Sequence, residues 1–119
     1  MSNSFSFRNL FRIGIFAPPD AVRGLLDAVQ AIIPLGDERY DSVHWLLEGA
    51  RERFRPLAGS RPTMGRIGEL SDVESALLVI AIPRDEALLQ QVLNDALLPS
   101  HPWESPSIFI DECRQPIPS

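Results

Sequence analysis

Hydrophobic residues at alternate positions mark the first predicted element of the chain. Within residues 7–16, Phe11, Ile13 and Ile15 follow one another at every second position. This spacing is typical of a strand that buries one of its faces. Pro18 and Pro19 come directly afterwards, and we expect them to end the strand.

Two later segments carry apolar residues at helical spacing instead. The first segment, residues 20–33, begins at Asp20, whose carboxylate we expect to cap the helix, and it stops before Pro34. The second helix is expected from about Asp85. The apolar stripes are Val22, Leu25, Leu26, Val29 and Ile33 in the first helix, and Leu88, Leu89, Val92, Leu93, Ala96 and Leu97 in the second.

Three further strands complete the predicted order. Residues 42–48 predict a strand that continues across Gly49 into residues 51–57, as a bent strand or a hairpin arm. The remaining loops are expected at 59–68 and 101–106, and the remaining strands at 73–82 and 107–111. The elements therefore follow one another as βαββαβ.

Length and element order together predict a single domain. The chain has 119 residues, a common size for one domain. We place this domain at residues 7–113 and expect flexible ends at 1–6 and 114–119. The order βαββαβ predicts an α+β fold, the ferredoxin-like sandwich, with a four-stranded antiparallel sheet and two helices on one face. This fold hosts many functions, so it leaves the chemistry open.

The second half of the strand predicted at residues 73–82, from Ala76 to Ile82, is apolar on both faces, because Leu77 and Val79 alternate with Leu78 and Ile80. Helices cover only one face of the predicted sheet, so the other face needs a different cover. A partner subunit is the most economical one in a chain of this length. The alternative is that long side chains of neighbouring strands shield this strand. We expect a homo-oligomer.

Charge and composition narrow the classes of partner. The formal net charge is −5, the wrong sign for a protein that binds nucleic-acid phosphates over a broad face. Hydrophobic residues make up 45% of the chain and charged residues 23%, as in ordinary globular domains. No apolar run approaches the roughly 20 residues of a membrane helix, and no signal peptide is apparent. We expect a cytoplasmic protein that binds neither nucleic acid nor membrane.

Arginines gather in the middle of the chain. Three of them stand at alternate positions, so an extended strand would present all three guanidinium groups on one side. The group comprises Arg51, Arg53, Arg55, Arg61 and Arg66, with Gly59 and Gly65 in the same stretch. Guanidinium groups and amides freed by glycine would bind the phosphate or carboxylate of an anionic small molecule. The alternative is a charged, solvated edge strand that guards against aggregation.

Metal-ligand candidates are few. His101 and Glu104 lie in one proline-bracketed loop, and a third ligand would be His44 or the single cysteine, Cys113, from a neighbouring subunit. The structural alternative is that His101 orients the turn by bonding a backbone carbonyl, while Trp103 packs over the last strand. We favour the structural role and predict no cofactor.

Several spaced motifs occur in a fixed order. Residues 54–65, Phe-Arg-Pro-Leu-Ala-Gly-Ser-Arg-Pro-Thr-Met-Gly, fit the signature Phe-x-Pro-x-x-Gly-x-x-Pro-x-x-Gly. Tyr40, Asp41 and Trp45 fit the pattern Tyr-Asp-x-x-x-Trp, and Val73-Glu74 fits a Val-Glu pair at the start of a strand. Residues 101–106 fit the pattern His-Pro-Tyr-Glu-x-Pro. Together they resemble the YqfO-like domain, which is the middle insert of the Nif-three family of dinuclear metal-centre proteins.

This resemblance implies a PII-like or CutA-like sandwich, in a group that commonly assembles as trimers. The family's paired metal ions are held by flanking domains, which the resemblance does not include, so we do not expect its metal-dependent hydrolysis here. Three residues depart from the family pattern: Trp103 stands in place of tyrosine, Ser105 in place of glutamate, and Glu52 in place of glycine. The family's glycine-rich turn appears here as residues 33–39.

The leading functional prediction is a non-catalytic, oligomeric interaction, regulatory or small-ligand-binding module, because the common catalytic and phosphate-binding motifs are missing. We expect a trimer, with a dimer as the alternative, and an anionic small molecule or a protein as its partner. The competing predictions are a divalent-metal-binding protein that uses His101 and Glu104, and a nucleotide hydrolase. The candidate ligand-binding residues are Tyr40, Arg53, Arg55, Gly59, Arg61, Gly65, His101, Trp103 and Glu104.

Overall fold

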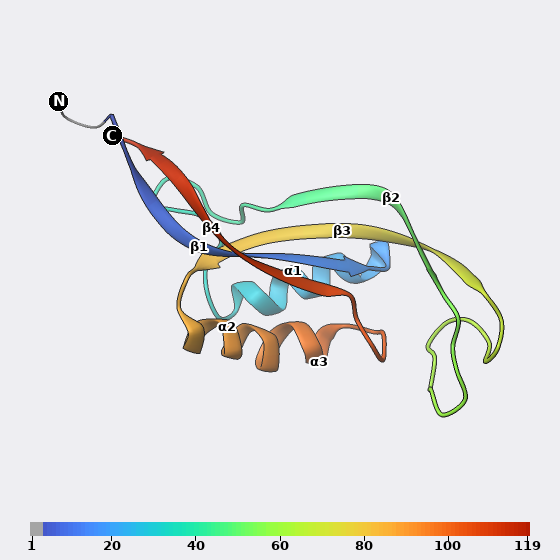
Figure 1. Cartoon of the computed structure of the whole chain (residues 1–119). Helices are drawn as coiled ribbons and strands as arrows, with labels where there is room; N and C mark the ends of the chain where they lie inside the picture. The colour runs from blue at the N-terminus through green and yellow to red at the C-terminus, as the bar shows by residue number, and fades with distance from the viewer. Residues whose placement is uncertain (1–3) are drawn as a thin grey trace.

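The computed structural model describes residues 4–119 and has the predicted order of elements. The first half contains β1 (Phe5–Ala17), the 3-10 turn η1 (Pro19–Ala21), α1 (Val22–Gln30) and β2 (Trp45–Phe54). The second half contains β3 (Ser71–Pro83), then α2 (Glu86–Val92), the π-helical segment η2 (Leu93–Leu97) and α3 (Leu98–Ser100) in direct succession, and finally β4 (Ile108–Pro118). The helices all lie on one side of the sheet (Figure 1).

The four strands form one antiparallel sheet in the order β2-β3-β1-β4. The two central strands, β1 and β3, pair Ile13 with Ile80 and Ile15 with Leu78. The edge strands β2 and β4 lie outside them. This arrangement confirms the predicted α+β, ferredoxin-like sandwich.

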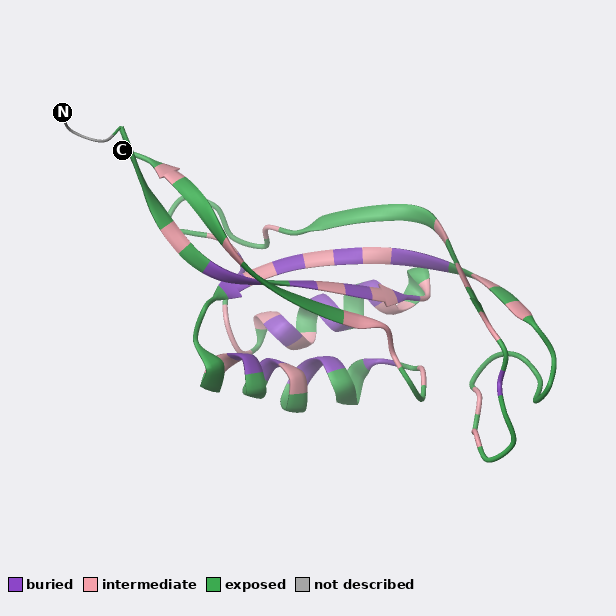
Figure 2. Cartoon of the chain, viewed as in Figure 1, coloured by how far each residue is buried: buried purple, intermediate pink, exposed green. Residues whose placement is uncertain are grey.

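The core lies between the sheet and the helices. Alternate residues of the central strands, such as Ile13 and Ile80, are fully buried there (Figure 2). The predicted helical stripes supply the opposite wall. Its buried members are Val22, Leu25, Leu26 and Val29 in α1, and Leu89, Val92, Ala96 and Leu97 in α2 and η2.

The ends of the first helix differ from the prediction. Asp20 lies inside η1, which Pro19 begins, and no side-chain hydrogen bond caps this turn or α1. Prolines favour the first positions of a helical turn, so Asp20 is placed within the turn rather than before it. The helix ends at Gln30 rather than 33, and the following loop adds Leu35 to the core with no exposed surface. Asp85 does cap α2, because its carboxylate accepts from the Leu88 amide.

The segment predicted as a bent strand is a single strand, β2, with a bulge. The pairing of β2 with β3 shifts between Leu47 and Ala50. Gly49 lies in that shift with a φ of 81°, a conformation that glycine adopts without strain. The strand ends at Phe54, so residues 55–57 belong to the loop that follows.

Strand pairing reaches further toward both ends of the chain than we expected. Phe5 pairs with Pro118, so residues 5–6 and 114–118 are paired strand rather than the flexible ends expected from the sequence. The Phe5 and Phe7 rings meet edge to face, and the Arg114 guanidinium lies 4.4 Å from the centre of the Phe7 ring. These contacts stabilise a two-stranded arm that projects from the body (Figure 1). Residues 1–3 lie outside the described part of the chain.

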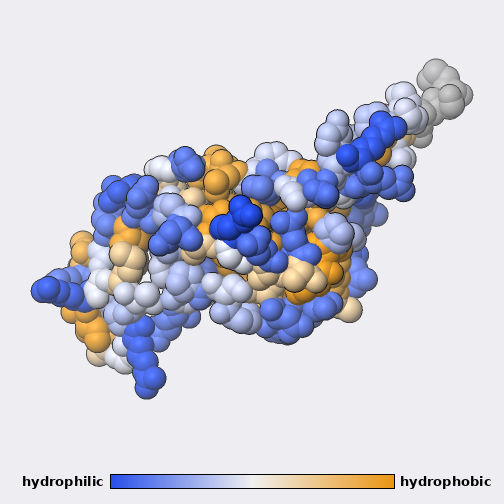
Figure 3. Space-filling view, turned by 180° about the vertical axis from the view of Figure 1, so that it is seen from behind, coloured by the Kyte–Doolittle hydropathy of each residue, from blue (hydrophilic) through white to orange (hydrophobic). Residues whose placement is uncertain are grey.

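The face of the sheet opposite the helices carries apolar side chains. Leu77 and Val79, which alternate with the core residues of β3, are half-buried, and both pair with residues of β2. We call this the outer sheet face, and its large apolar residues are Phe16, Trp45, Leu47, Leu77, Val79 and Phe109. Of these, Trp45, Leu47 and Phe109 are at least half exposed. Seen from behind, the molecule has separate hydrophobic patches on its body and on the loop between β2 and β3 (Figure 3).

Candidate functional site

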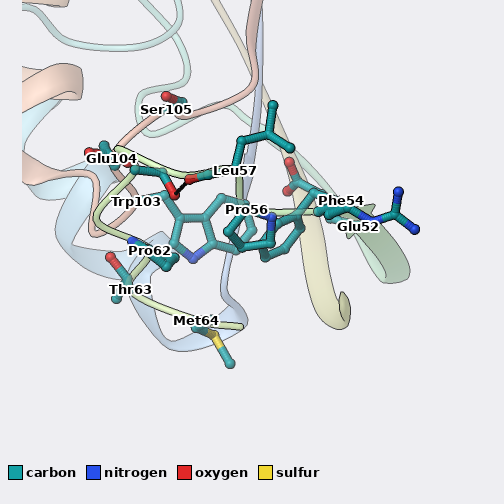
Figure 4. A pocket seen from close by; sticks show the side chains of 12 residues that line it. Glu52, Phe54, Pro56, Leu57, Pro62, Thr63, Met64, Trp103, Glu104 and Ser105 are labelled. Atoms are coloured by element: carbon teal, nitrogen blue, oxygen red, sulfur yellow. Dashed lines mark hydrogen bonds between the residues drawn. The ribbon is translucent and has the colours of Figure 1, made fainter. Parts of the chain in front are cut away.

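A cavity of about 340 Å³ opens where two loops meet. One loop, residues 55–70, joins β2 to β3, and the other, residues 101–107, joins α3 to β4. We call this cavity the loop pocket. Its lining residues are Glu52, Phe54, Arg55, Pro56, Leu57, Ser60, Pro62, Thr63, Met64, Trp103, Glu104 and Ser105. Side chains of both loops, among them Trp103 and Pro56, converge in it (Figure 4).

Hydrogen bonds fasten the two loops to each other. The Arg61 amide donates to both carboxylate oxygens of Glu104, at 2.9 and 3.1 Å. The Thr63 hydroxyl donates to the Pro102 carbonyl at 2.8 Å. A carboxylate that receives a backbone amide makes a stronger bond than a neutral acceptor does. The pocket is therefore built by contacts between segments that are far apart in the sequence.

His101 holds the second loop against the sheet. The residue is 7% exposed, and its Nδ1 accepts from the Trp103 amide at 3.1 Å. Because Nδ1 is an acceptor, the ring proton lies on Nε2, which donates to the Phe16 carbonyl at 2.7 Å. This geometry agrees with the structural role that we favoured, including the predicted bond to a backbone carbonyl. Both ring nitrogens are engaged, so neither is free to bind a metal.

The other metal-ligand candidates do not meet His101. His44 Nδ1 lies 2.8 Å from the Ser42 carbonyl, in the loop before β2, and Cys113 lies half-buried in β4. Across residues 4–119, no group of three or more histidine, cysteine or acidic side chains is placed to hold a metal ion.

Glu52 is a pocket residue that the sequence did not single out as a ligand-binding candidate. Its Oε1 accepts from the Ser107 hydroxyl at 2.8 Å, while its Oε2 is buried and has no hydrogen-bond partner within the described chain. A buried carboxylate oxygen without a donor is unfavourable. One feature of the sequence could have pointed to Glu52: it stands where the family pattern has a glycine.

The arginine group is divided in the structure. Arg51 and Arg53 both bind Asp72 on β3, at 2.8 and 3.2 Å. The hydrogen bond from Arg51, together with the charges of both arginines, holds the pKa of Asp72 below its usual value of 3.8. Of the five arginines, only Arg55 lines the loop pocket. These pairs fit the alternative of a charged edge strand.

The remaining candidates have separate roles. Arg61 uses its backbone amide to hold Glu104. Gly65 has a φ of 88°, and a Cβ atom there would collide with the Ser71 hydroxyl oxygen, so this glycine is needed for close packing. Gly59 has a φ of 96° with open space around it. Neither glycine lines the pocket.

Tyr40 belongs to a different cavity, of about 310 Å³, next to the arm formed by β1 and β4. There Arg8 donates to the Gly36 carbonyl and to the Gln115 side chain. Asp37 accepts the amides of Arg39 and Tyr40, and these bonds lower the pKa of its carboxyl group. The structure therefore brings Arg55, Trp103 and Glu104 together but places Tyr40 elsewhere.

Comparisons with known proteins identify the fold. No family model matches the sequence, and no curated protein matches it significantly. Among solved structures, a Bacillus cereus protein related to NIF3 covers 93% of this chain at 18% identity with a TM-score of 0.70. This chain spans 27% of that protein.

Within the described residues, no helix is long and apolar enough to span a membrane.

Two smaller proteins match over most of their own length. The divalent ion tolerance protein CutA1 from Ehrlichia chaffeensis covers 91% of this chain, with 84% of its own length aligned, at 10% identity and a TM-score of 0.63. The GlnK protein of B. subtilis covers 88% of this chain and 85% of its own, at 14% identity and a TM-score of 0.54. At these identities the likeness concerns the fold alone. The chain thus has a PII/CutA-like fold that resembles one segment of a NIF3-related protein.

Proposed function

We propose that this chain is a non-catalytic, oligomeric module that binds a small organic ligand in the loop pocket. The observation that carries this proposal is the pocket itself, which joins aromatic and proline side chains to a few charged groups. Small-molecule sites are commonly concave and mostly apolar, with a small number of placed polar groups. The hydrogen bonds between the loops hold these walls in place before a ligand arrives.

We also propose that the outer sheet face joins copies of the chain as a homotrimer in the cytoplasm. The support is the row of apolar residues on this face, which the helices of the same chain do not cover. The PII/CutA-like resemblance favours three subunits over two. For the regulatory role, we propose that a bound ligand changes the conformation of the 55–70 and 101–107 loops, which a partner protein would contact.

The two competing functions, metal binding and nucleotide hydrolysis, both depend on His101, and this residue has a structural role. His101 uses Nδ1 for the Trp103 amide and Nε2 for the Phe16 carbonyl. Metal binding or proton transfer at either nitrogen would require breaking one of these bonds inside a buried site. The geometry therefore favours ligand binding over a metal site at the 101–107 loop and over a nucleotide hydrolase that depends on His101.

A thermal-shift screen tests the ligand site. Neutral, cationic and anionic aromatic metabolites are added to the wild-type chain, to Trp103→Ala and to Leu70→Ala. Leu70 is 75% exposed in the same loop and does not line the pocket, so it controls for loss of an apolar side chain. We expect stabilisation of the wild type and of Leu70→Ala that disappears in Trp103→Ala. Shifts that survive in Trp103→Ala would contradict the proposal.

Light scattering tests the assembly with a matched pair of variants. Leu47, on the outer sheet face, is 54% exposed, and Leu98, on the helical side, is 50% exposed. We expect the trimer to persist in Leu98→Glu and to dissociate in Leu47→Glu, because a charge would enter a buried contact. A wild-type chain that scatters as a 13.3 kDa monomer would overturn this part of the proposal.

A further inference from the structure

We infer that the loop pocket takes a small planar aromatic cation, such as a ring that carries an amidinium or ammonium group. This inference rests on the proposal that the pocket is a ligand site, and it adds the chemical class of the ligand. Three features of the pocket carry it: the aromatic wall, the distribution of charge around it, and the unpaired oxygen of Glu52.

Flat side chains form the wall of the pocket. Trp103 and Phe54 contribute aromatic rings, and Pro56 and Pro62 contribute rigid rings. Figure 4 shows Trp103, Pro56, Phe54 and Met64 among the side chains that line the pocket. Such surfaces stack on a planar molecule, and the faces of aromatic rings attract cations. The wall therefore suits a planar ligand and is compatible with positive charge on it.

Charge at the pocket is negative on balance. Its lining contains two carboxylates, half-buried Glu52 and exposed Glu104, and one cation, exposed Arg55. Arg51 and Arg53, which would have favoured an anion, bind Asp72 instead. An anionic ligand would meet two carboxylates with a single exposed guanidinium to compensate. A cationic ligand meets the same carboxylates with a favourable sign.

Glu52 provides the specific acceptor. The Ser107 hydroxyl anchors Oε1, and the buried Oε2 has no donor among residues 4–119. The terminal torsion of glutamate is soft, so a ligand N–H can draw the carboxylate toward the cavity while Ser107 keeps its bond. The ligand then donates a hydrogen bond to Oε2, which no described residue of the chain provides. Both oxygens of Glu104 already share the Arg61 amide, which holds that carboxylate to the 55–70 loop, so we assign the ligand N–H to Glu52.

Three probes of the same shape and different charge test this inference: benzamidine, which is cationic, benzamide, which is neutral, and benzoate, which is anionic. Isothermal titration of the full chain gives their affinities. NMR signals of the indole N–H groups of the two tryptophans show whether a probe reaches Trp103. The Trp45→Phe variant identifies which signal belongs to Trp103. We expect benzamidine to bind at least about tenfold more tightly than benzoate and to shift the Trp103 signal.

Two variants locate the source of the preference. We expect the isosteric change Glu52→Gln to remove most of the preference for benzamidine. Glu48→Gln removes the same charge from an exposed position of β2 outside the pocket, and we expect it to preserve the preference. The comparison of probes on the wild type does not depend on either variant folding correctly.

The possible failures are distinct. Tighter binding of benzoate, with loss of that preference in Arg55→Ala, would overturn the cationic ligand class while retaining the ligand site. A benzamidine preference that is equal in Glu52→Gln and Glu48→Gln would overturn the role of Glu52. Absence of binding and of indole shifts for all three probes, together with a negative metabolite screen, would overturn the proposed ligand-binding function itself.

Discussion

His101 is the residue whose replacement tests the architecture of the pocket most directly. It is 7% exposed and satisfies the Phe16 carbonyl on β1 and the Trp103 amide in the 101–107 loop. In His101→Ala both backbone groups lose their partner, at about 1 to 3 kcal/mol for each. We therefore expect a loss of about 2 to 6 kcal/mol in the free energy of unfolding, measured by urea denaturation.

Two conservative variants separate the contributions of the ring nitrogens. The side-chain oxygen of Asn lies near the position of Nδ1, so His101→Asn keeps an acceptor for the Trp103 amide. The amide nitrogen of Gln lies near the position of Nε2, so His101→Gln keeps a donor for the Phe16 carbonyl. Each variant loses one of the two bonds, and we expect each to lose about 1 to 3 kcal/mol.

The fluorescence of Trp103 distinguishes the Asn and Gln variants of His101. In a Trp45→Phe background, we expect His101→Gln to shift the Trp103 fluorescence because the loop amide is released, and His101→Asn to leave it nearly unchanged. The reasoning would be refuted if His101→Ala stayed within about 0.5 kcal/mol of the wild type, the range of an ordinary surface change. Equal fluorescence shifts in the Asn and Gln variants would refute the assignment of the two nitrogens.

Three further predictions concern stability and use urea denaturation. Gly65→Ala and Gly59→Ala both place a side chain at positive φ, at about 1 to 2 kcal/mol, but only the first collides with Ser71, so we expect it to be clearly less stable; equal losses would contradict the packing role. The pKa of Asp72 is lowered in the folded chain, so its stabilising contribution is present above pH 3.8 and is lost as the pH falls through the folded-state pKa. We expect Asp72→Asn to reduce this acid-induced loss, and an unchanged pH profile would contradict it. Ile80→Ala removes a fully buried side chain and should cost about 2 to 5 kcal/mol, whereas Ile67→Ala, at an exposed position, should cost less than about 0.5 kcal/mol.

Periodicity in the sequence was sufficient for the sheet and the helices, because burial of one face leaves a direct record in the order of residues. Phe11, Ile13 and Ile15 are all buried, and the stripe of the second helix is buried except at Leu88 and Leu93, which are partly buried. Element ends were less predictable. Asp20 has the chemistry of a cap, but the prolines before it place it within a turn. The arm of β1 and β4 lacks a buried face, and the short alternation of Phe5 and Phe7 was not sufficient to predict it.

The site was only partly predictable for a different physical reason. Trp103, Glu104 and Arg55 were expected as candidates, and the structure brings them to one pocket. The pairing of Arg51 and Arg53 with Asp72 depends on the register of β2 against β3, which the spacing of arginines does not contain. Likewise, the bond from Ser107 to Glu52 joins residues 55 positions apart. Such contacts follow from tertiary packing and leave no local pattern.

The position of β1 in the sheet determines when the chain can complete its fold. The first strand is central, and Ile13 pairs with Ile80 on one side and with Ile110 on the other. Contacts so distant in sequence make closure of the sheet slow compared with a helical bundle of the same size. During synthesis, β1 emerges before the other three strands, and its apolar residues stay unpaired until β3 has emerged. The loop pocket forms later still, because the 101–107 loop is placed only when β4 docks beside β1. A ribosome-bound chain that ends before β4 therefore carries most of the core residues but has no complete loop pocket.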